Sequence, residues 1–259
     1  MQPVNEQSYD TIESPIGLPI LHKGPPLIVG PLPAIFYFTL GAEDSLNVDP
    51  FNQLVLNLAN DPIRIFSFTL PGHTDDVDKS KAITFWAEAI SKNHDVINEF
   101  IFKSLKNINY LVEQGFIYPH RIATAGLSRG SFIATHLALR EPRIHTILGF
   151  APLTKFEPLE EFQPILHHPI IESLELNKYL KQLVGKNLRY YIGNRDTRVG
   201  TEHCFSFIKD LTDVSYDEGL RSPPVELIVS PAIGMKGHGT PPSAFQDAAS
   251  WIKGKLLST

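Results

Sequence analysis

Apolar residues along the chain follow two different spacings. Short, nearly continuous apolar runs alternate with longer stretches in which apolar residues recur every three or four positions. The runs are typical of strands buried on both faces, and the longer stretches of amphipathic helices. This alternation predicts the fold class α/β, with a mostly parallel central sheet and helices on both faces. Strands are expected near residues 34–40, 63–70, 121–126, 145–151, 188–193 and 225–230, and helices near 50–60, within 80–114, and near 129–140, 173–184, 200–211 and 243–256.

Two segments depart from this alternation. Residues 1–33 are rich in proline and glycine and are expected to form an extended arm or a weak edge strand. Residues 34–259 are expected to form one domain, because no polar or glycine-rich linker divides them. Within that domain, residues 154–172 carry three prolines among apolar side chains, which suits a small lid or a proline-pinned loop and is too short for a large cap. If the segment is a lid, Phe156 is expected to contact substrate.

Composition narrows the classes of function. The net charge of −5 argues against a nucleic-acid partner. The single cysteine, Cys204, leaves no intrachain disulfide and suits a reducing compartment. Residues 1–7 lack the basic start and apolar core of a signal peptide, and no apolar stretch is long enough to span a membrane. These features predict a cytoplasmic protein without a membrane span, and they leave its oligomeric state open.

The most informative chemical feature is Gly126-Leu127-Ser128-Arg129-Gly130. It follows one of the apolar runs and precedes the helix-like stretch 131–139. A serine at the apex of so sharp a strand-to-helix turn needs glycine two residues before and after it, because larger side chains would collide with neighbouring backbone. Ser128 is therefore a candidate nucleophile. The alternative is a glycine-rich turn in which Ser128 only caps the following helix.

Two further residues complete the chemistry that a serine nucleophile requires. Asp196 and His238 each lie in a loop directly after a predicted strand, so the chain order is Ser128, Asp196, His238. A serine hydroxyl needs a base to remove its proton, and that base needs a carboxylate to hold its tautomer. The spacing predicts a catalytic triad of these three residues.

Other acids and bases fit these roles less well. The predicted helices carry the rival acids Asp210 and Asp213 and the rival bases His136 and His203, away from the strand ends. His73 would break the expected chain order and is interpreted as loop structure or a pocket rim. His167 and His168 lack a nearby carboxylate spacing, so no metal site is predicted.

These motifs resemble those of α/β-hydrolases, within that fold most closely the dienelactone hydrolase and prolyl-oligopeptidase-like branch. The resemblance covers residues 34–257 and is carried by 117–123 leading into 126–130, by 193–199 and by 237–239. It implies a serine hydrolase that forms an acyl-enzyme on Ser128 and needs no metal or organic cofactor. The expected substrate is a small-molecule carboxylic ester. The alternatives are a small-peptide or amide hydrolase and a non-catalytic binding protein that keeps the fold.

Acyl transfer also requires donors for the oxyanion. One is expected to be the N–H of Arg129, directly after the nucleophile. The other is expected from the loop after the strand at 34–40, with Leu40 favoured and Gly41 as the alternative and as a substrate contact. The family's common His-Gly is replaced here by Thr39-Leu40. The Arg129 side chain is expected to pair with Glu43 or Asp44, or else to clamp a substrate carboxylate.

Overall fold

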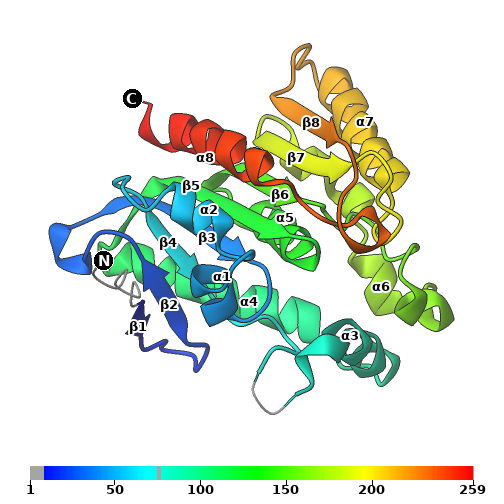
Figure 1. The fold of residues 1–259 in the computed structure, drawn as a ribbon, viewed down its shortest axis with the longest axis horizontal. Helices are drawn as coiled ribbons and strands as arrows, with labels where there is room; N and C mark the ends of the chain where they lie inside the picture. The colour runs from blue at the N-terminus through cyan, green and yellow to red at the C-terminus, as the bar shows by residue number, and fades with distance from the viewer. Residues whose placement is uncertain (1–8, 75–76, 259) are drawn as a thin grey trace.

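The computed structural model describes residues 9–74 and 77–258, and within these ranges eight strands form one sheet (Figure 1). The strand order is β1-β2-β4-β3-β5-β6-β7-β8. β1 (Asp10–Ile12) and β2 (Ile20–Lys23) are antiparallel at one edge, and the other strands are parallel. Those parallel strands are β3 (Leu32–Phe38), β4 (Arg64–Ser67), β5 (Ile117–Leu127), β6 (Ile144–Phe150), β7 (Asn187–Gly193) and β8 (Val225–Ser230).

The chain reverses its direction of progress across the sheet at β3. β4 pairs with one side of β3, and β5 pairs with the other side. In open α/β sheets, ligands bind beyond the carboxyl ends of the strands at such a switch point. The loops that follow β3 and β5 are therefore the expected place for a site.

Helices cover both faces of the sheet, as the alternation of strands and helices predicts (Figure 1). Successive side chains of a strand point to opposite faces. Accordingly, Ala34, Phe36 and Phe38 of β3 join one apolar core, whereas Ile35 and Tyr37 join the other. The first core is closed by α3 (Ala82–Ser91), α4 (Val96–Glu113), α5 (Arg129–Arg140) and α7 (Thr201–Asp217), and the second by α1 (Ala42–Asn47), α2 (Gln53–Asn57) and α8 (Pro242–Leu257).

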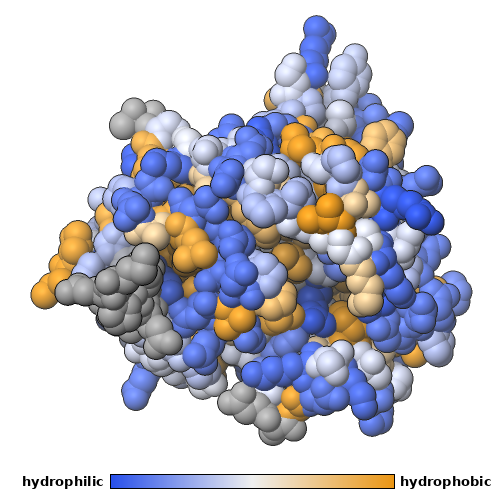
Figure 2. All heavy atoms as spheres, in the orientation of Figure 1, coloured by the Kyte–Doolittle hydropathy of each residue, from blue (hydrophilic) through white to orange (hydrophobic). Residues whose placement is uncertain are grey.

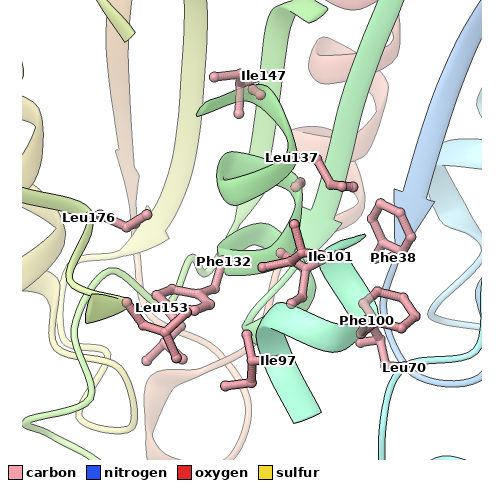
Figure 3. Close-up of a cluster of buried hydrophobic side chains, with 14 of the residues drawn as sticks. Phe38, Leu70, Ile97, Phe100, Ile101, Phe132, Leu137, Ile147, Leu153 and Leu176 are labelled. Carbon is pink, nitrogen blue, oxygen red and sulfur yellow. The ribbon is translucent and has the colours of Figure 1, made fainter. Parts of the chain in front are cut away.

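Figure 3 shows the first core where α4 and α5 approach β3. Phe38 of β3 meets Phe100 of α4 edge to face, with ring centroids 6.1 Å apart. Phe132 of α5 lies in the same cluster (Figure 3). The helix that begins directly after Ser128 is therefore packed into the same buried apolar cluster as β3 and α4.

The long helix expected within 80–114 is α4, and the shorter α3 precedes it. Asn93 has a φ of 61°, which ends α3, and the Asp95 carboxylate accepts a hydrogen bond from the N–H of Asn98 at 2.9 Å, which caps α4. The stretch expected as a helix at 173–184 is instead a 3₁₀ segment, η4 (Leu176–Leu183), with a kink at Tyr179. The short helix α1 was not predicted.

The N-terminal segment and the 154–172 segment both contribute to the fold. Residues 9–33 supply β1, β2 and the 3₁₀ turn η1 (Leu27–Val29), while residues 1–8, which include the stretch examined for a signal peptide, lie outside the described ranges. Segment 154–172 contains η3 (Glu160–Ile165) and enters α6 (Pro169–Ser173). Phe156 and Phe162 stack with ring centroids 4.4 Å apart and belong to the first apolar core, so this segment packs onto the domain.

Polar and apolar residues are interspersed on the face drawn in Figure 2. Across the described ranges, no helix has both the length and the apolar character needed to cross a membrane.

Candidate active site

Ser128 sits on a strained turn between β5 and α5. Its φ is 56° and its ψ is −119°, a conformation that residues other than glycine rarely adopt. Hydrogen bonds hold the backbone there: the Ser128 N–H donates to the Phe150 carbonyl at 2.8 Å, and the Ser128 carbonyl accepts from the N–H of Leu153 at 3.2 Å. The β6 strand and the segment after it thus fix the position of the hydroxyl.

The two glycines of the motif are required by close backbone approach. A Cβ added at Gly126 would overlap the Gly130 carbonyl, and one added at Gly130 would overlap the Phe38 carbonyl oxygen at the end of β3. The sequence interpretation of these glycines agrees with this packing.

The structure brings Ser128, His238 and Asp196 into one chain of hydrogen bonds. His238 Nε2 lies 2.9 Å from Ser128 Oγ, and His238 Nδ1 lies 2.7 Å from Asp196 Oδ2. Because a carboxylate only accepts, Nδ1 carries the proton and Nε2 is free to accept the serine proton. The Asp196 side chain is fully buried, and its Oδ1 accepts from the N–H groups of Arg198 at 2.9 Å and Val199 at 3.1 Å.

Backbone contacts bring the Asp196 and His238 loops together. Gly237 has a φ of 74°, and a Cβ there would overlap the Arg195 carbonyl. The N–H of Thr197 donates to the Lys236 carbonyl at 2.8 Å. The glycine before His238 thus allows the two loops to approach closely enough for the ring to reach the carboxylate.

Two backbone N–H groups, of Leu40 and Arg129, follow the ends of the neighbouring strands β3 and β5. β3 and β5 are parallel, and Phe38 pairs with Gly126. Leu40 lies two residues beyond Phe38, and Ser128 lies two residues beyond Gly126. Within the described ranges, neither the Leu40 N–H nor the Arg129 N–H donates to a protein acceptor. The Gly41 N–H, by contrast, donates to Asp44 Oδ2 at 3.2 Å. Leu40 is therefore the donor of this loop that remains available to an oxyanion.

A cavity of about 210 Å³ opens at Ser128 and His238. Among its lining residues, Arg198 forms a two-pronged ion pair with Glu161, at 3.0 and 2.7 Å. Of this lining, sequence reasoning singled out only Ser128, Arg129 and His238, because the others come from three separate segments, 80–83, 153–161 and 198–199. Those others are Ser80, Ile83, Leu153, Leu159, Glu161, Arg198 and Val199.

The Arg129 side chain differs from the favoured expectation. Within the described ranges its guanidinium forms no ion pair or hydrogen bond, with Glu43, Asp44 or any other residue. Burial, together with the charge of Arg198, lowers the pKa of Arg129 to about 10, so the group still carries its charge at neutral pH.

Phe156 and Gly41 are not among the residues lining the Ser128 cavity. Phe156 packs edge to face on Phe132, with centroids 4.9 Å apart, and lines a separate cavity of about 360 Å³. The physical reason is that 154–172 turns this ring toward Phe132, and the same segment contributes Leu159 and Glu161 to the Ser128 cavity instead.

The rival acids and bases lie elsewhere. Asp210 accepts from Asn177 at 2.6 Å and Asp213 pairs with Lys209. His136 Nε2 donates to the Leu174 carbonyl at 3.0 Å, and His203 lies 3.9 Å from Glu157.

The remaining candidates for separate chemistry are engaged or buried. His73 is buried, which with the charge of Arg129 lowers its pKa to about 3. Burial raises the pKa of the Cys204 thiol, and His168 Nδ1 accepts from the Ile170 N–H at the start of α6. The described residues contain no cluster of three or more metal-ligating side chains.

No family model and no curated protein matches the chain. Solved structures do match. TT1662 from Thermus thermophilus aligns with a TM-score of 0.73 at 18% identity, over 97% of this chain and 100% of that one. Esterase PF2001 from Pyrococcus furiosus aligns with a TM-score of 0.62 at 14% identity, over 97% and 92% of the two chains. The acylaminoacyl peptidase of Pyrococcus horikoshii aligns with a TM-score of 0.63 at 12% identity, and the match spans 95% of this chain and only 40% of the peptidase. Together with the strand order, these likenesses show that the chain has the α/β-hydrolase fold.

Proposed function

We propose that the protein is a serine hydrolase that cleaves small carboxylic esters through an acyl-enzyme on Ser128. The observation that carries this proposal is the unbroken chain of hydrogen bonds from Ser128 Oγ through His238 to the buried Asp196. The structural similarity to an esterase over 92% of that protein's length supports an ester as the substrate.

In the proposed reaction, Ser128 Oγ attacks the ester carbonyl while His238 Nε2 accepts its proton. Asp196 holds the Nδ1 proton and stabilises the imidazolium that forms. The N–H groups of Arg129 and Leu40 donate to the oxyanion of the tetrahedral intermediate. His238 then protonates the leaving alkoxide, and water attacks the acyl-enzyme by the same route in reverse.

The size of the cavity favours small substrates. About 210 Å³ lies below the usual range of about 300–1,000 Å³ for pockets that hold drug-sized ligands. Short acyl chains are therefore expected to react faster than long ones.

The test is hydrolysis of p-nitrophenyl esters from acetate to decanoate by wild type, Ser128→Ala and Ser91→Ala. Losing a triad serine costs on the order of 10⁶ in kcat. Ser91 is exposed and donates only to the Glu88 carbonyl, so the same chemical change there is expected to leave the rate intact.

A fluorophosphonate probe provides a second measurement that does not depend on the leaving group. Labelling confined to Ser128 with no ester turnover would favour the amide alternative, and short peptide amides would then be assayed. Folded protein that neither labels nor hydrolyses any substrate would contradict the proposal and favour a binding protein.

A further inference from the structure

The Ser128 cavity contains one guanidinium whose charge is not neutralised. Arg129 and Arg198 both line the cavity, and only Glu161 lines it with a negative charge. Both carboxylate oxygens of Glu161 already accept hydrogen bonds from the guanidinium of Arg198. One positive charge is therefore left over, and it belongs to Arg129.

No other acidic group reaches this charge within the described ranges. Arg129 makes no ion pair or hydrogen bond there, and Asp44 is engaged by the Gly41 N–H. The neighbouring His73 is neutral, since burial and the charge of Arg129 depress its pKa to about 3. Glu161 acts on both arginines through its charge, and the three charged side chains together keep a net charge of +1 at the cavity.

Leaving such a charge unpaired is costly, and the surroundings raise the cost. Ile83, Leu153, Leu159 and Val199 form apolar walls around the same cavity. Burial of a charge without a partner is unfavourable, and an anion that pairs with the charge recovers part of that free energy. The arrangement therefore favours an anionic ligand over a neutral one.

We propose that the Arg129 guanidinium binds a carboxylate of the substrate, so that the preferred esters carry a carboxylate a few atoms from the scissile carbonyl. This inference rests on the proposed ester hydrolysis at Ser128. A carboxylate matches the planar fork of a guanidinium with two parallel hydrogen bonds. It also matches the single uncompensated charge, which a doubly charged group would exceed.

The test compares charged esters with neutral esters of similar size. Monomethyl glutarate against methyl pentanoate places the carboxylate on the acyl side. 4-Acetoxybenzoate against its methyl ester places it on the alcohol side. For each pair the ratio of kcat/KM is measured within one variant, so any general loss of activity cancels.

Wild type is expected to prefer the charged ester of one pair by about 10- to 100-fold, the range for a hydrogen bond to a charged group. Arg129→Met removes the charge and is expected to abolish that preference, while its main-chain N–H remains. Arg129→Lys keeps the charge without the fork and is expected to retain part of it. The matched control is Arg121→Met, since Arg121 lies in the first half of β5, against Tyr118 and seven residues before Ser128, and this variant should keep the full preference.

Binding provides a readout independent of turnover. Titration calorimetry of monomethyl glutarate and 4-acetoxybenzoate into Ser128→Ala is expected to show binding of the preferred ester. The affinity should fall at least about 10-fold when Arg129→Met is added.

The two readouts separate the two proposals. Hydrolysis of the neutral esters with no charge preference, and equal binding by both variants, overturns the carboxylate inference and leaves the hydrolase standing. Arg129-dependent binding without any turnover supports the inference and contradicts the hydrolase. If neither turnover nor Arg129-dependent binding is seen, both proposals fail.

Discussion

At the scale of single residues, the site depends on which nitrogen of His238 carries the proton. Asp196 decides this, because its Oδ1 already accepts from two backbone N–H groups and only Oδ2 faces the ring. An asparagine would keep its carbonyl oxygen on the two backbone donors and turn its NH₂ group toward Nδ1. The ring would then be protonated at Nε2 and unable to accept the serine proton.

Asp196→Asn is accordingly expected to lower kcat for ester hydrolysis by about 10⁴ with little change in stability. The matched control is Asp213→Asn, since Asp213 lies on the surface of α7 and pairs only with Lys209. Steady-state kinetics with urea unfolding of both variants check this. An unchanged kcat in Asp196→Asn, or an equal loss in Asp213→Asn, would contradict the role proposed for Asp196.

At the scale of elements, the turn between β5 and α5 works only if β3 can lie against it. Gly130 touches the Phe38 carbonyl with no room for a Cβ, and Phe38 leads directly into the Leu40 loop. The close contact that packs the helix against the strand therefore also sets the spacing between Ser128 and the Leu40 N–H.

Gly130→Ala is expected to destabilise the protein by about 1–3 kcal/mol through overpacking, and to reduce activity by displacing the Leu40 loop. Gly254 offers the opposite case, because it lies within α8 and a Cβ there meets nothing within 4 Å. Gly254→Ala is expected to stabilise the protein by up to about 1 kcal/mol. Urea unfolding of both variants measures the contrast, and a stable, fully active Gly130→Ala would refute this packing argument.

At the scale of the whole molecule, a buried histidine links the helix of the nucleophile to the segment after α6. His136 Nε2 donates to the Leu174 carbonyl at 3.0 Å, and Nδ1 accepts from Arg140 at 2.7 Å. Burial, and then the charge of Arg140, lower the pKa of His136 to about 3. The folded protein therefore holds this ring neutral well below the pH at which an unfolded histidine takes up its proton.

This difference makes stability depend on pH in one direction. In the unfolded chain His136 takes up a proton below about pH 6.5, whereas in the folded protein it stays neutral down to about pH 3. The contribution of His136 to the free energy of unfolding should therefore be fully present above pH 6.5. Below that pH it should fall by about 1.4 kcal/mol per pH unit. Urea unfolding at pH 7 and 5.5 checks this. Between these pH values, the free energy of unfolding of His136→Gln is expected to fall by about 1 kcal/mol less than that of wild type. Equal losses would show that His136 is not the group responsible.

Patterns local in sequence predicted most of the elements, and tertiary contacts explain where they differed. Continuous apolar runs located the parallel strands, because these strands are buried on both faces, and period-3.6 spacing located most of the helices, because each buries one face. The break between α3 and α4 has a local cause, the Asp95 cap, that apolar spacing alone does not register. The kink at Tyr179 and the inward turn of Phe156 depend on the residues that pack against them, so the spacing of apolar residues along the sequence does not predict either.

The sequence by itself determined the fold class and the three residues that meet at the site. The carboxyl ends of parallel strands meet at one edge of the sheet, so a serine, an acid and a base that follow β5, β7 and β8 converge there. Only the tertiary structure decided that Arg129 stays unpaired, that Leu40 rather than Gly41 has a free N–H, and which side chains wall the cavity. Each of these features depends on which segments, distant in sequence, pack around a given group, and only the packing of the whole chain determines that.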